Sequence, residues 1–290
     1  MEIGISLPDM FGSAPPDLPG LAREVERLGL ESVWVADVQT GTGLPWLEAV
    51  TALAAVAGAT ESVRLGFGAL ALPTRPAPWL ATQVATLQHL SGDRLLLGVG
   101  SGGFPDAPFW RALRIDGRER GRRTDETLRV LPDLVAGRPA TVAGVEITLA
   151  PGATMPPVLV GGSSDVAIRR ATRFGHGWFP SLISPARLAE RERQVPTTVG
   201  GHLFAAEGPE RTAFVRSLVE VNRLPPDEAE RVPMPGGSPQ RIAEHFAAYA
   251  AAGAERVVTG PHAADQAEWL RQVEQIAAAA EILGETVEDA

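Results

Sequence analysis

Residues 2–37, EIGISLPDMFGSAPPDLPGLAREVERLGLESVWVAD, carry the pattern that decides the fold. Apolar side chains alternate along residues 2–8, and residues 32–36 are rich in β-branched and aromatic side chains, so both segments predict strands. Between them Asp17 can cap a helix, and apolar residues follow at helical spacing, at Leu18, Leu21, Val25 and Leu28. The stretch therefore predicts a strand, a helix and a second strand in succession.

The same unit recurs along the rest of the chain. Apolar runs separated by helical patterns predict eight strands, at residues 2–8, 32–36, 63–72, 94–99, 157–160, 177–181, 197–205 and 255–259. Eight strand–helix units predict an α/β fold, a single (β/α)8 TIM barrel domain over residues 1–290, with insertions after the fourth and seventh strands. An open doubly wound sheet also fits the alternation. The count of eight, and the lack of a G-x-G-x-x-G motif after the first strand, favour the closed barrel.

The composition excludes several kinds of catalysis. The chain contains no cysteine, and all 26 basic residues are arginine. Without cysteine there is no disulfide, thiolate nucleophile or iron–sulfur cluster, and without lysine there is no Schiff base. None of the five histidines has the H-x-H or H-E-x-x-H spacing of metal sites, so we expect no catalytic metal.

The charge pattern bears on partners and location. The net charge is -9, and the acidic residues are scattered among arginines, which argues against binding to nucleic acid or to an anionic membrane. No apolar run reaches the roughly 20 residues that span a bilayer, and the first residues lack a signal-peptide pattern. We expect a cytoplasmic protein whose partner is a small-molecule substrate.

Two loops that follow predicted strands are rich in glycine. Residues 100–103 read GSGG and residues 161–164 read GGSS. In (β/α)8 barrels the working residues lie on such loops, at the carboxyl ends of the strands. The second loop opens a helix, whose free N–H groups and positive end can bind a phosphate. Glycines are also ordinary turn residues, so ligand binding and turn formation both remain open for each loop.

Several longer motifs indicate a family. Residues 64–70, RLGFGAL, and 80–100, LATQVATLQHLSGDRLLLGVG, closely resemble the bacterial luciferase-like monooxygenase superfamily, and residues 28–37, 156–163 and 175–178 agree with it in the same order. The resemblance covers about residues 1–260. It implies a (β/α)8 barrel and an oxidoreductase that uses either reduced FMN with oxygen or the deazaflavin coenzyme F420 for hydride transfer.

The resemblance also implies cofactor-binding residues. Gly68, Ala69 and Ala71 would form a bulged third strand, often with a non-prolyl cis peptide, that supports the flavin ring. Further positions would contact the ring, the ribityl chain, a cofactor hydroxyl or the phosphate: Asp37, Ser101, Gly102, Arg122, Gly161, Gly162, Ser163 and Ser164. Two of these have an alternative role, since Asp37 could cap the following turn and Arg122 could pair with Asp125 or Glu126 on a helix surface.

The positions that commonly carry chemistry depart from the family. Val38 stands where many relatives have a histidine, and Gly103 stands where the deazaflavin-dependent sugar dehydrogenases have an acid. These losses argue against that dehydrogenase mechanism but not against flavin binding. His262, after the eighth strand, and His202, on the seventh, are the candidates for proton transfer, with a packed structural role as the alternative for His202.

The sequence therefore predicts an FMN- or F420-dependent oxidoreductase or monooxygenase that acts on a small, hydrophobic organic substrate. A noncatalytic flavin-binding barrel and a flavin-independent phosphate-ester barrel enzyme remain alternatives. The resemblance alone suggests a homodimer.

Overall fold

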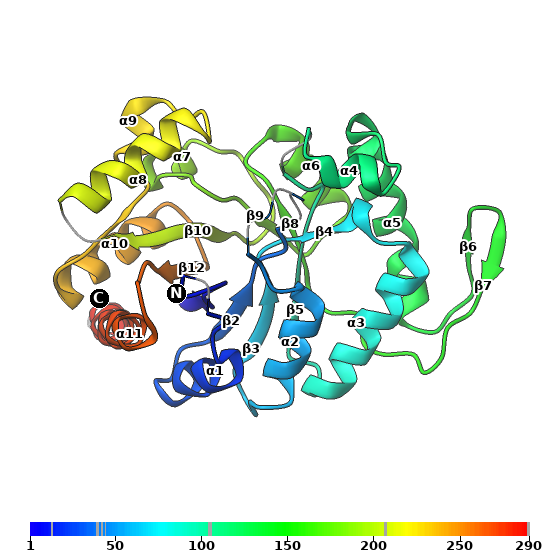
Figure 1. Ribbon diagram of the computed structural model, residues 1–290, viewed down its shortest axis with the longest axis horizontal. Helices are drawn as coiled ribbons and strands as arrows, with labels where there is room; N and C mark the ends of the chain where they lie inside the picture. The colour runs from blue at the N-terminus through cyan, green and yellow to red at the C-terminus, as the bar shows by residue number, and fades with distance from the viewer. Residues whose placement is uncertain are drawn as a thin grey trace.

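The structure is a computed structural model that describes residues 1–12, 14–38, 41, 43, 45–103, 106–205 and 208–288, without the side chains of 202–205, 210 and 286–288. Its centre is a barrel of eight main strands joined by helices (Figure 1). These strands are β1 (Glu2–Ser6), β2 (Ser32–Val35), β3 (Arg64–Phe67), β5 (Leu95–Gly100), β8 (Val158–Gly161), β9 (Gly177–Phe179), β10 (Thr198–Ala205) and β12 (Arg256–Pro261). The predicted (β/α)8 fold is confirmed.

The sheet is parallel throughout its main path. Strands pair in the order β10-β12-β1-β2-β3-β5-β8-β9. Isolated parallel bridges, Trp178 with Thr197 and Ser181 with Gly200, then join the β9 edge to β10. The barrel is therefore closed by a few bonds at this seam and by continuous ladders elsewhere. Parallel strands buried on both faces explain apolar runs such as LLLGVG in β5.

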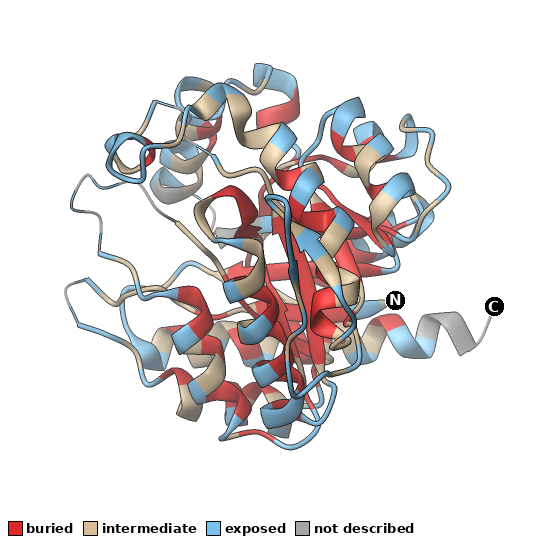
Figure 2. Ribbon diagram, turned by 90° about the vertical axis from the view of Figure 1, so that its right-hand side faces the viewer, coloured by how far each residue is buried: buried red, intermediate tan, exposed pale blue. Residues whose placement is uncertain are grey.

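Helices surround the barrel and bury their apolar faces against it. Figure 2 shows the strands and the inner helix faces buried, with the outer helix faces exposed. The helices are α1 (Leu18–Arg27), α2 (Ala49–Ala57), α3 (Ala77–Ser91), α4 (Pro108–Ala112), α5 (Arg120–Val135), α6 (Asp165–Phe174), α7 (Pro185–Ala189), α8 (Pro209–Glu220), α9 (Pro226–Ala229), α10 (Pro239–Ala251) and α11 (Gln266–Glu288), with short 3-10 turns η1 (Leu72–Thr74) and η2 (Gly117–Glu119). The expected cap is present on α1, where the Asp17 carboxylate accepts a hydrogen bond of 3.1 Å from the Gly20 N–H.

Two segments differ from the sequence expectation. The predicted third strand, residues 63–72, is split into β3 and β4 (Leu70–Ala71) around residues 68–69, and β4 pairs with β5. The Pro-rich segment 139–157 contains an antiparallel hairpin, β6 (Ala140–Val142) and β7 (Val145–Ile147). The hairpin turn uses Ala143 and Gly144, both at positive φ, a two-residue arrangement that matches strand twist.

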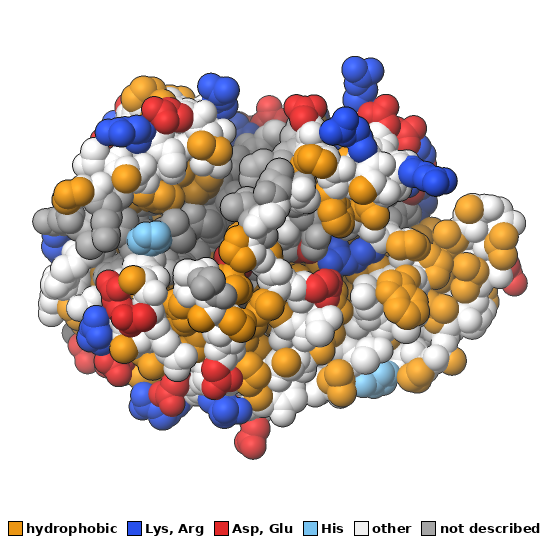
Figure 3. Space-filling view, in the orientation of Figure 1, with side chains coloured by type: hydrophobic (Ala, Val, Ile, Leu, Met, Phe, Trp, Pro, Cys, Tyr) orange, Lys and Arg blue, Asp and Glu red, His pale blue; other side chains and the backbone are white. Residues whose placement is uncertain are grey.

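Apolar side chains gather over this hairpin on the right of Figure 3, where Val145 is 61% exposed. A last short strand, β11 (Met234–Pro235), extends the sheet beside β10. No helix in the described ranges combines the length and apolarity needed to cross a bilayer.

Trp34 fills the inside of the barrel beneath the strand ends. It is 1% exposed, its indole N–H donates to Ser32 Oγ over 2.8 Å, and its ring centroid lies 5.1 Å from that of Phe179. A Cβ on Gly4 would lie 2.6 Å from the Trp34 Nε1 atom. Glycine on the neighbouring strand therefore provides the room for tryptophan, and the packed interior forms a floor under the barrel mouth.

Candidate cofactor site at the carboxyl ends of the strands

A cavity of about 350 Å³ opens at the carboxyl ends of the strands. It is lined by residues at the ends of β5, β8 and β9 or just after β3, β5, β8 and β9, together with two residues within β10: Gly68, Ala69, Gly100, Ser101, Gly102, Gly103, Gly161, Gly162, Phe179, Ser181, Gly200 and Gly201. Its volume lies at the lower end of the roughly 300–1,000 Å³ found for small-molecule sites. This is the end of a (β/α)8 barrel at which ligands bind.

Backbone rather than side chains forms most of the cavity wall. Eight of the twelve lining residues are glycines. A Cβ at Gly161 would lie 3.1 Å from the Val99 carbonyl oxygen and 3.4 Å from the Ala69 Cβ, and one at Gly102 would lie 2.6 Å from the Trp110 ring. Glycine is therefore required for the close approach of these loops, and it leaves a cradle that a flat ring can enter.

The segment after β3 forms one side of this cradle. The peptide bond between Gly68 and Ala69 is cis, as the resemblance implied. The chain then enters β4, where the Ala71 N–H donates to the Asp37 carboxylate over 2.9 Å. Ala71 itself is 5% exposed and is not among the lining residues. It supports the cradle from behind.

An ion pair fixes this segment. Both carboxylate oxygens of Asp37, whose side chain is fully buried, accept hydrogen bonds from Arg75, at 2.7 and 3.1 Å, and Arg75 also reaches Glu48 at 3.0 Å. Burial alone would lower the pKa of Arg75, but the two carboxylates outweigh it and raise the pKa above its ordinary value. Asp37 thus clamps the turn after β4, and its predicted contact with a cofactor hydroxyl stays a prediction.

The loop after β8 leads from the cavity into α6. Ser164 caps the helix by accepting a hydrogen bond of 3.3 Å from the Ala167 N–H, and Ser163 Oγ donates to the Ser181 carbonyl over 2.9 Å. Trp178 donates to the Gly162 carbonyl over 2.7 Å, which holds the loop against β9. Within the described residues, the N–H groups of Ser163 and Ser164 donate to no protein acceptor. Free N–H groups at a helix start can bind a phosphate.

The structure brings some of the predicted residues together and separates others. Gly68, Ala69, Ser101, Gly102, Gly161 and Gly162 all line the cavity. Arg122 instead lies exposed on α5 and pairs with Glu126 at 2.6 Å and Glu119 at 3.1 Å. The surface pairing weighed from the sequence is thus what Arg122 makes, and its contact with a phosphate stays untested.

Neither candidate histidine is among the described residues that line the cavity. His262 is exposed just after β12, and its carbonyl accepts a hydrogen bond of 2.9 Å from Gln272. The backbone of His202 lies in β10 opposite Thr259 in β12, but its side chain falls outside the described residues. Their roles in proton transfer stay predictions.

Asp9 is a titratable group at the mouth that sequence reasoning missed. It follows β1 at the carboxyl end of the strand, is partly buried, and makes no hydrogen bond or ion pair with the described residues. Burial raises the pKa of this carboxyl from 3.8 to about 7. The signal that nominated Asp37, an acid just after a predicted strand, also applied to Asp9. What the sequence did not reveal was the desolvation.

The sequence is similar to a known protein family and to several curated relatives. The family model described as luciferase-like monooxygenase matches residues 1–199. The chain belongs to this family. Among curated relatives, the F420-dependent glucose-6-phosphate dehydrogenase of Beutenbergia cavernae is 34% identical over 182 residues, which cover 57% of this chain and 52% of the relative. The matches extend over about half the length of the curated relatives.

Two solved structures of other proteins have the same fold as this luciferase-like chain. An F420-dependent secondary alcohol dehydrogenase in complex with an F420-acetone adduct superposes with a TM-score of 0.74 at 16% identity, covering 96% of this chain and 98% of the other. The oxygenating constituent of 3,6-diketocamphane monooxygenase from Pseudomonas putida, in complex with FMN, gives 0.71 at 17% identity, covering 96% of each. These similarities show the shared barrel.

Proposed function

We propose that this luciferase-like protein binds FMN or F420 in the glycine-lined cavity and catalyses an oxidoreduction of a small, hydrophobic organic substrate. The observation that carries the proposal is the cradle of backbone made by the loops after β3, β5 and β8. The family match and the relatives that use F420 or FMN support the choice of cofactor class.

The residues of the chain would divide the work of binding. When bound, the cofactor supplies hydride transfer or, for reduced FMN, oxygen activation. The Gly68–Ala69 segment and the neighbouring 100–103 loop would hold the ring, and the N–H groups of Ser163 and Ser164 would hold the phosphate. Phe179, packed on Trp34, would exclude water from the apolar floor of the cavity.

Parallel titration with FMN and F420, each oxidised and reduced, tests this proposal through cofactor fluorescence or absorbance. Preference for F420 would indicate hydride transfer, and preference for reduced FMN would indicate oxygen chemistry. Binding of neither cofactor to the wild-type protein would contradict the proposal.

A Gly103→Leu variant ties the binding to the cavity. Gly103 lines the cavity and a Cβ there would meet no atom within 4 Å, so we expect a larger side chain to narrow the cavity with little cost to the fold. We expect affinity for the preferred cofactor to fall at least about tenfold, because the new side chain occupies its space. Gly284→Leu, in α11, also has no atom within 4 Å of the new Cβ and serves as the matched control. Unchanged affinity in Gly103→Leu would place the site elsewhere.

One observation favours noncatalytic flavin binding as a second candidate. Among the described residues that line the cavity, none has a side chain that titrates near neutral pH. Bound cofactor that reduces or oxidises no substrate in a screen of small alcohols, ketones and aldehydes would support this candidate. Turnover of any of them would support the enzyme.

A further inference from the structure

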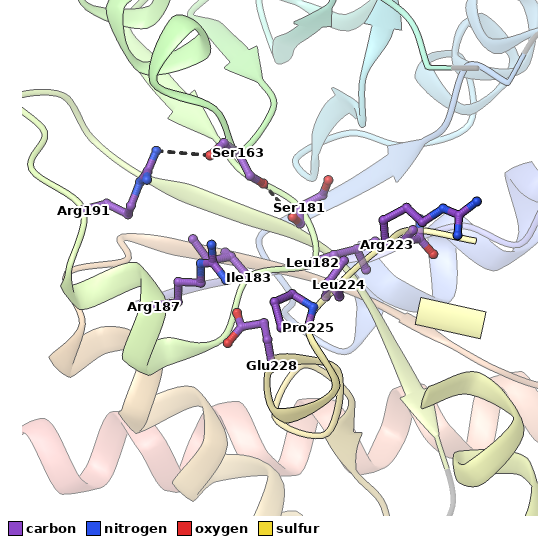
Figure 4. Close-up of a pocket in the computed structure, with 11 residues that line it drawn as sticks. Ser163, Ser181, Leu182, Ile183, Arg187, Arg191, Arg223, Leu224, Pro225 and Glu228 are labelled. Atoms are coloured by element: carbon purple, nitrogen blue, oxygen red, sulfur yellow. Dashed lines mark hydrogen bonds between the residues drawn. The ribbon is translucent and has the colours of Figure 1, made fainter. Parts of the chain in front are cut away.

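A second cavity, of about 340 Å³, adjoins the candidate cofactor cavity (Figure 4). The two meet at the contact between the β8–α6 and β9–α7 loops. Ser181 lines both cavities, and Ser163, which lines the second, follows Gly162 of the first. The hydrogen bond from Ser163 Oγ to the Ser181 carbonyl, 2.9 Å long, crosses this contact. A ligand that extends past the loop after β8 would enter the second cavity.

Three arginines line this second cavity. Arg187 lies on α7, Arg191 just beyond it, and Arg223 on the turn between α8 and α9. Figure 4 shows Arg187 and Arg191 on one side and Arg223 on the other, with Ser163 and Ser181 between them. Arginines therefore line the cavity from two separate segments, the end of α7 and the turn between α8 and α9, with the guanidinium group of Arg223 pointing away from Arg187 and Arg191.

The nearby carboxylates do not neutralise all of this charge. Arg191 is paired with Asp165 at 2.6 Å. Glu228, the one carboxylate among the described lining residues, is buried and accepts hydrogen bonds of 2.7 Å from both the N–H and the hydroxyl of Ser184. Within the described part of the chain, Arg187 and Arg223 form no ion pair and no side-chain hydrogen bond. Two guanidinium groups thus remain available to a ligand.

Arg223 has a backbone conformation that is unfavourable for an arginine. Its φ is +60°, in the left-handed region that side chains other than glycine, asparagine and aspartate rarely adopt. Glycine would fit this conformation without strain, whereas arginine costs the fold some stability. A glycine here would therefore remove the charge and relieve the backbone at once.

We propose that the cavity lined by Arg187 and Arg223 binds an anionic group, a phosphate or carboxylate, that is distinct from the group held by the 161–164 loop. Guanidinium groups suit both anions because they donate paired hydrogen bonds to two oxygens. The group belongs either to a cofactor segment that continues beyond the loop or to the substrate. The proposal rests on the proposed function in one respect, the presence of a cofactor in the neighbouring cavity.

Calorimetric titration with inorganic pyrophosphate tests the pocket in the full-length protein. We expect the pyrophosphate dissociation constant to rise at least about tenfold in Arg187→Met/Arg223→Gly, since charge-assisted hydrogen bonds are lost. The control is Arg129→Met/Arg271→Met, which removes two exposed arginines of α5 and α11 that do not line the cavity and form no ion pair with the residues that the structure describes, and it should leave binding unchanged. Equal binding by wild type and the first double variant, or equal loss in the control, would overturn the proposal.

The midpoint of thermal unfolding of each variant distinguishes a loss of binding from a loss of folding. Because glycine fits the conformation at position 223, the first double variant should melt no lower than the control pair. If the double variant has both a lower midpoint and weaker binding, the single variant Arg187→Met decides, because the Arg187 side chain is exposed. Arg187→Met must then weaken binding for the proposal to stand.

Repeating the titration with saturating cofactor identifies the source of the anion. Loss of pyrophosphate binding when F420 or FMN is bound assigns the pocket to that cofactor, and retained binding assigns it to the substrate. If the wild-type protein binds neither cofactor, the proposed function fails. The difference between the arginine variant and its control is still measured in that case.

Discussion

Asp9 and His245 are single residues whose ionisation the fold opposes. Asp9 lies at the barrel mouth after β1, and His245 lies on α10 with a buried Nε2 atom that has no hydrogen-bond partner in the described structure. Their effects on stability follow from the difference in pKa between the folded and unfolded states.

The Asp9 carboxyl should make the protein less stable as the pH rises. Its folded-state pKa is about 7, against 3.8 when unfolded. Between these values the unfolded chain loses the proton and the folded chain keeps it, so stability falls, by up to about 4 kcal/mol above pH 7. We expect Asp9→Asn to be more stable than wild type at pH 8 and similar at pH 4, as measured by urea unfolding. An advantage of the same size at both pH values would refute this.

His245 should act in the opposite direction. Burial lowers the pKa of its imidazole from 6.5 to about 4. As the pH falls from 6.5 to about 4, His245 binds a proton in the unfolded chain but not in the folded chain. The free energy of unfolding therefore decreases toward low pH, by up to about 3 kcal/mol. His245→Phe keeps the edge contact with Tyr249, whose ring centroid is 5.1 Å away, and removes the titration. Its gain over wild type should appear at pH 5 and vanish at pH 8.

At the scale of elements, the clamp between Asp37 and Arg75 joins the end of β2 to the turn after β4. The pair is almost fully enclosed, with side-chain exposures of 0% and 11%. Removal of one partner from a buried ion pair leaves the other charge without compensation and costs about 3–5 kcal/mol. Because the clamp supports the Gly68–Ala69 side of the cavity, cofactor affinity should fall as well.

Asp37→Asn tests this role of the clamp. We expect a loss of about 3 kcal/mol in the free energy of unfolding. The control is Asp133→Asn, whose exposed pair with Arg138, with exposures of 49% and 60%, should contribute less than about 1 kcal/mol. Adding Arg75→Met to Asp37→Asn should cost less than Arg75→Met alone, since Arg75 then loses only its pair with the half-exposed Glu48. Additive losses would show that the two residues act independently.

At the scale of the whole molecule, the cofactor cavity draws on four separate strand–loop connections. Its walls come from the loops after β3, β5, β8 and β9, and β10 adds Gly200 and Gly201. Two of these segments, the one after β9 and the one in β10, meet at the seam that isolated bridges close. A ligand that contacts them all should therefore stabilise the closed barrel.

The thermal midpoint should rise with cofactor concentration. A ligand at 100 times its dissociation constant adds about 2.7 kcal/mol to the stability of the folded state, and for a chain of this size that raises the midpoint by roughly 5 °C. Differential scanning fluorimetry with FMN and with F420 measures this shift. At the same cofactor concentration Gly103→Leu should show about half of this shift or less, and Gly284→Leu should retain it.

The sequence determined the order of strands and helices, the barrel and the family. Strand pairing between neighbours, helical apolar stripes and the glycine-rich loops are local features, and each is visible along the chain. The cis peptide at Gly68–Ala69 and most of the cavity lining also followed from motifs that stand together in the sequence.

Only the tertiary structure decided which charges meet and which are buried. Arg75 lies 38 residues from Asp37, and the arginines of the second cavity come from α7, the residues just after it and the turn between α8 and α9, which no local pattern relates. The raised pKa of Asp9 likewise depends on the desolvation imposed by its surroundings. Periodicity reports which face of an element is apolar, whereas ion pairs and desolvation depend on distances between distant segments, and those distances exist only in the folded barrel.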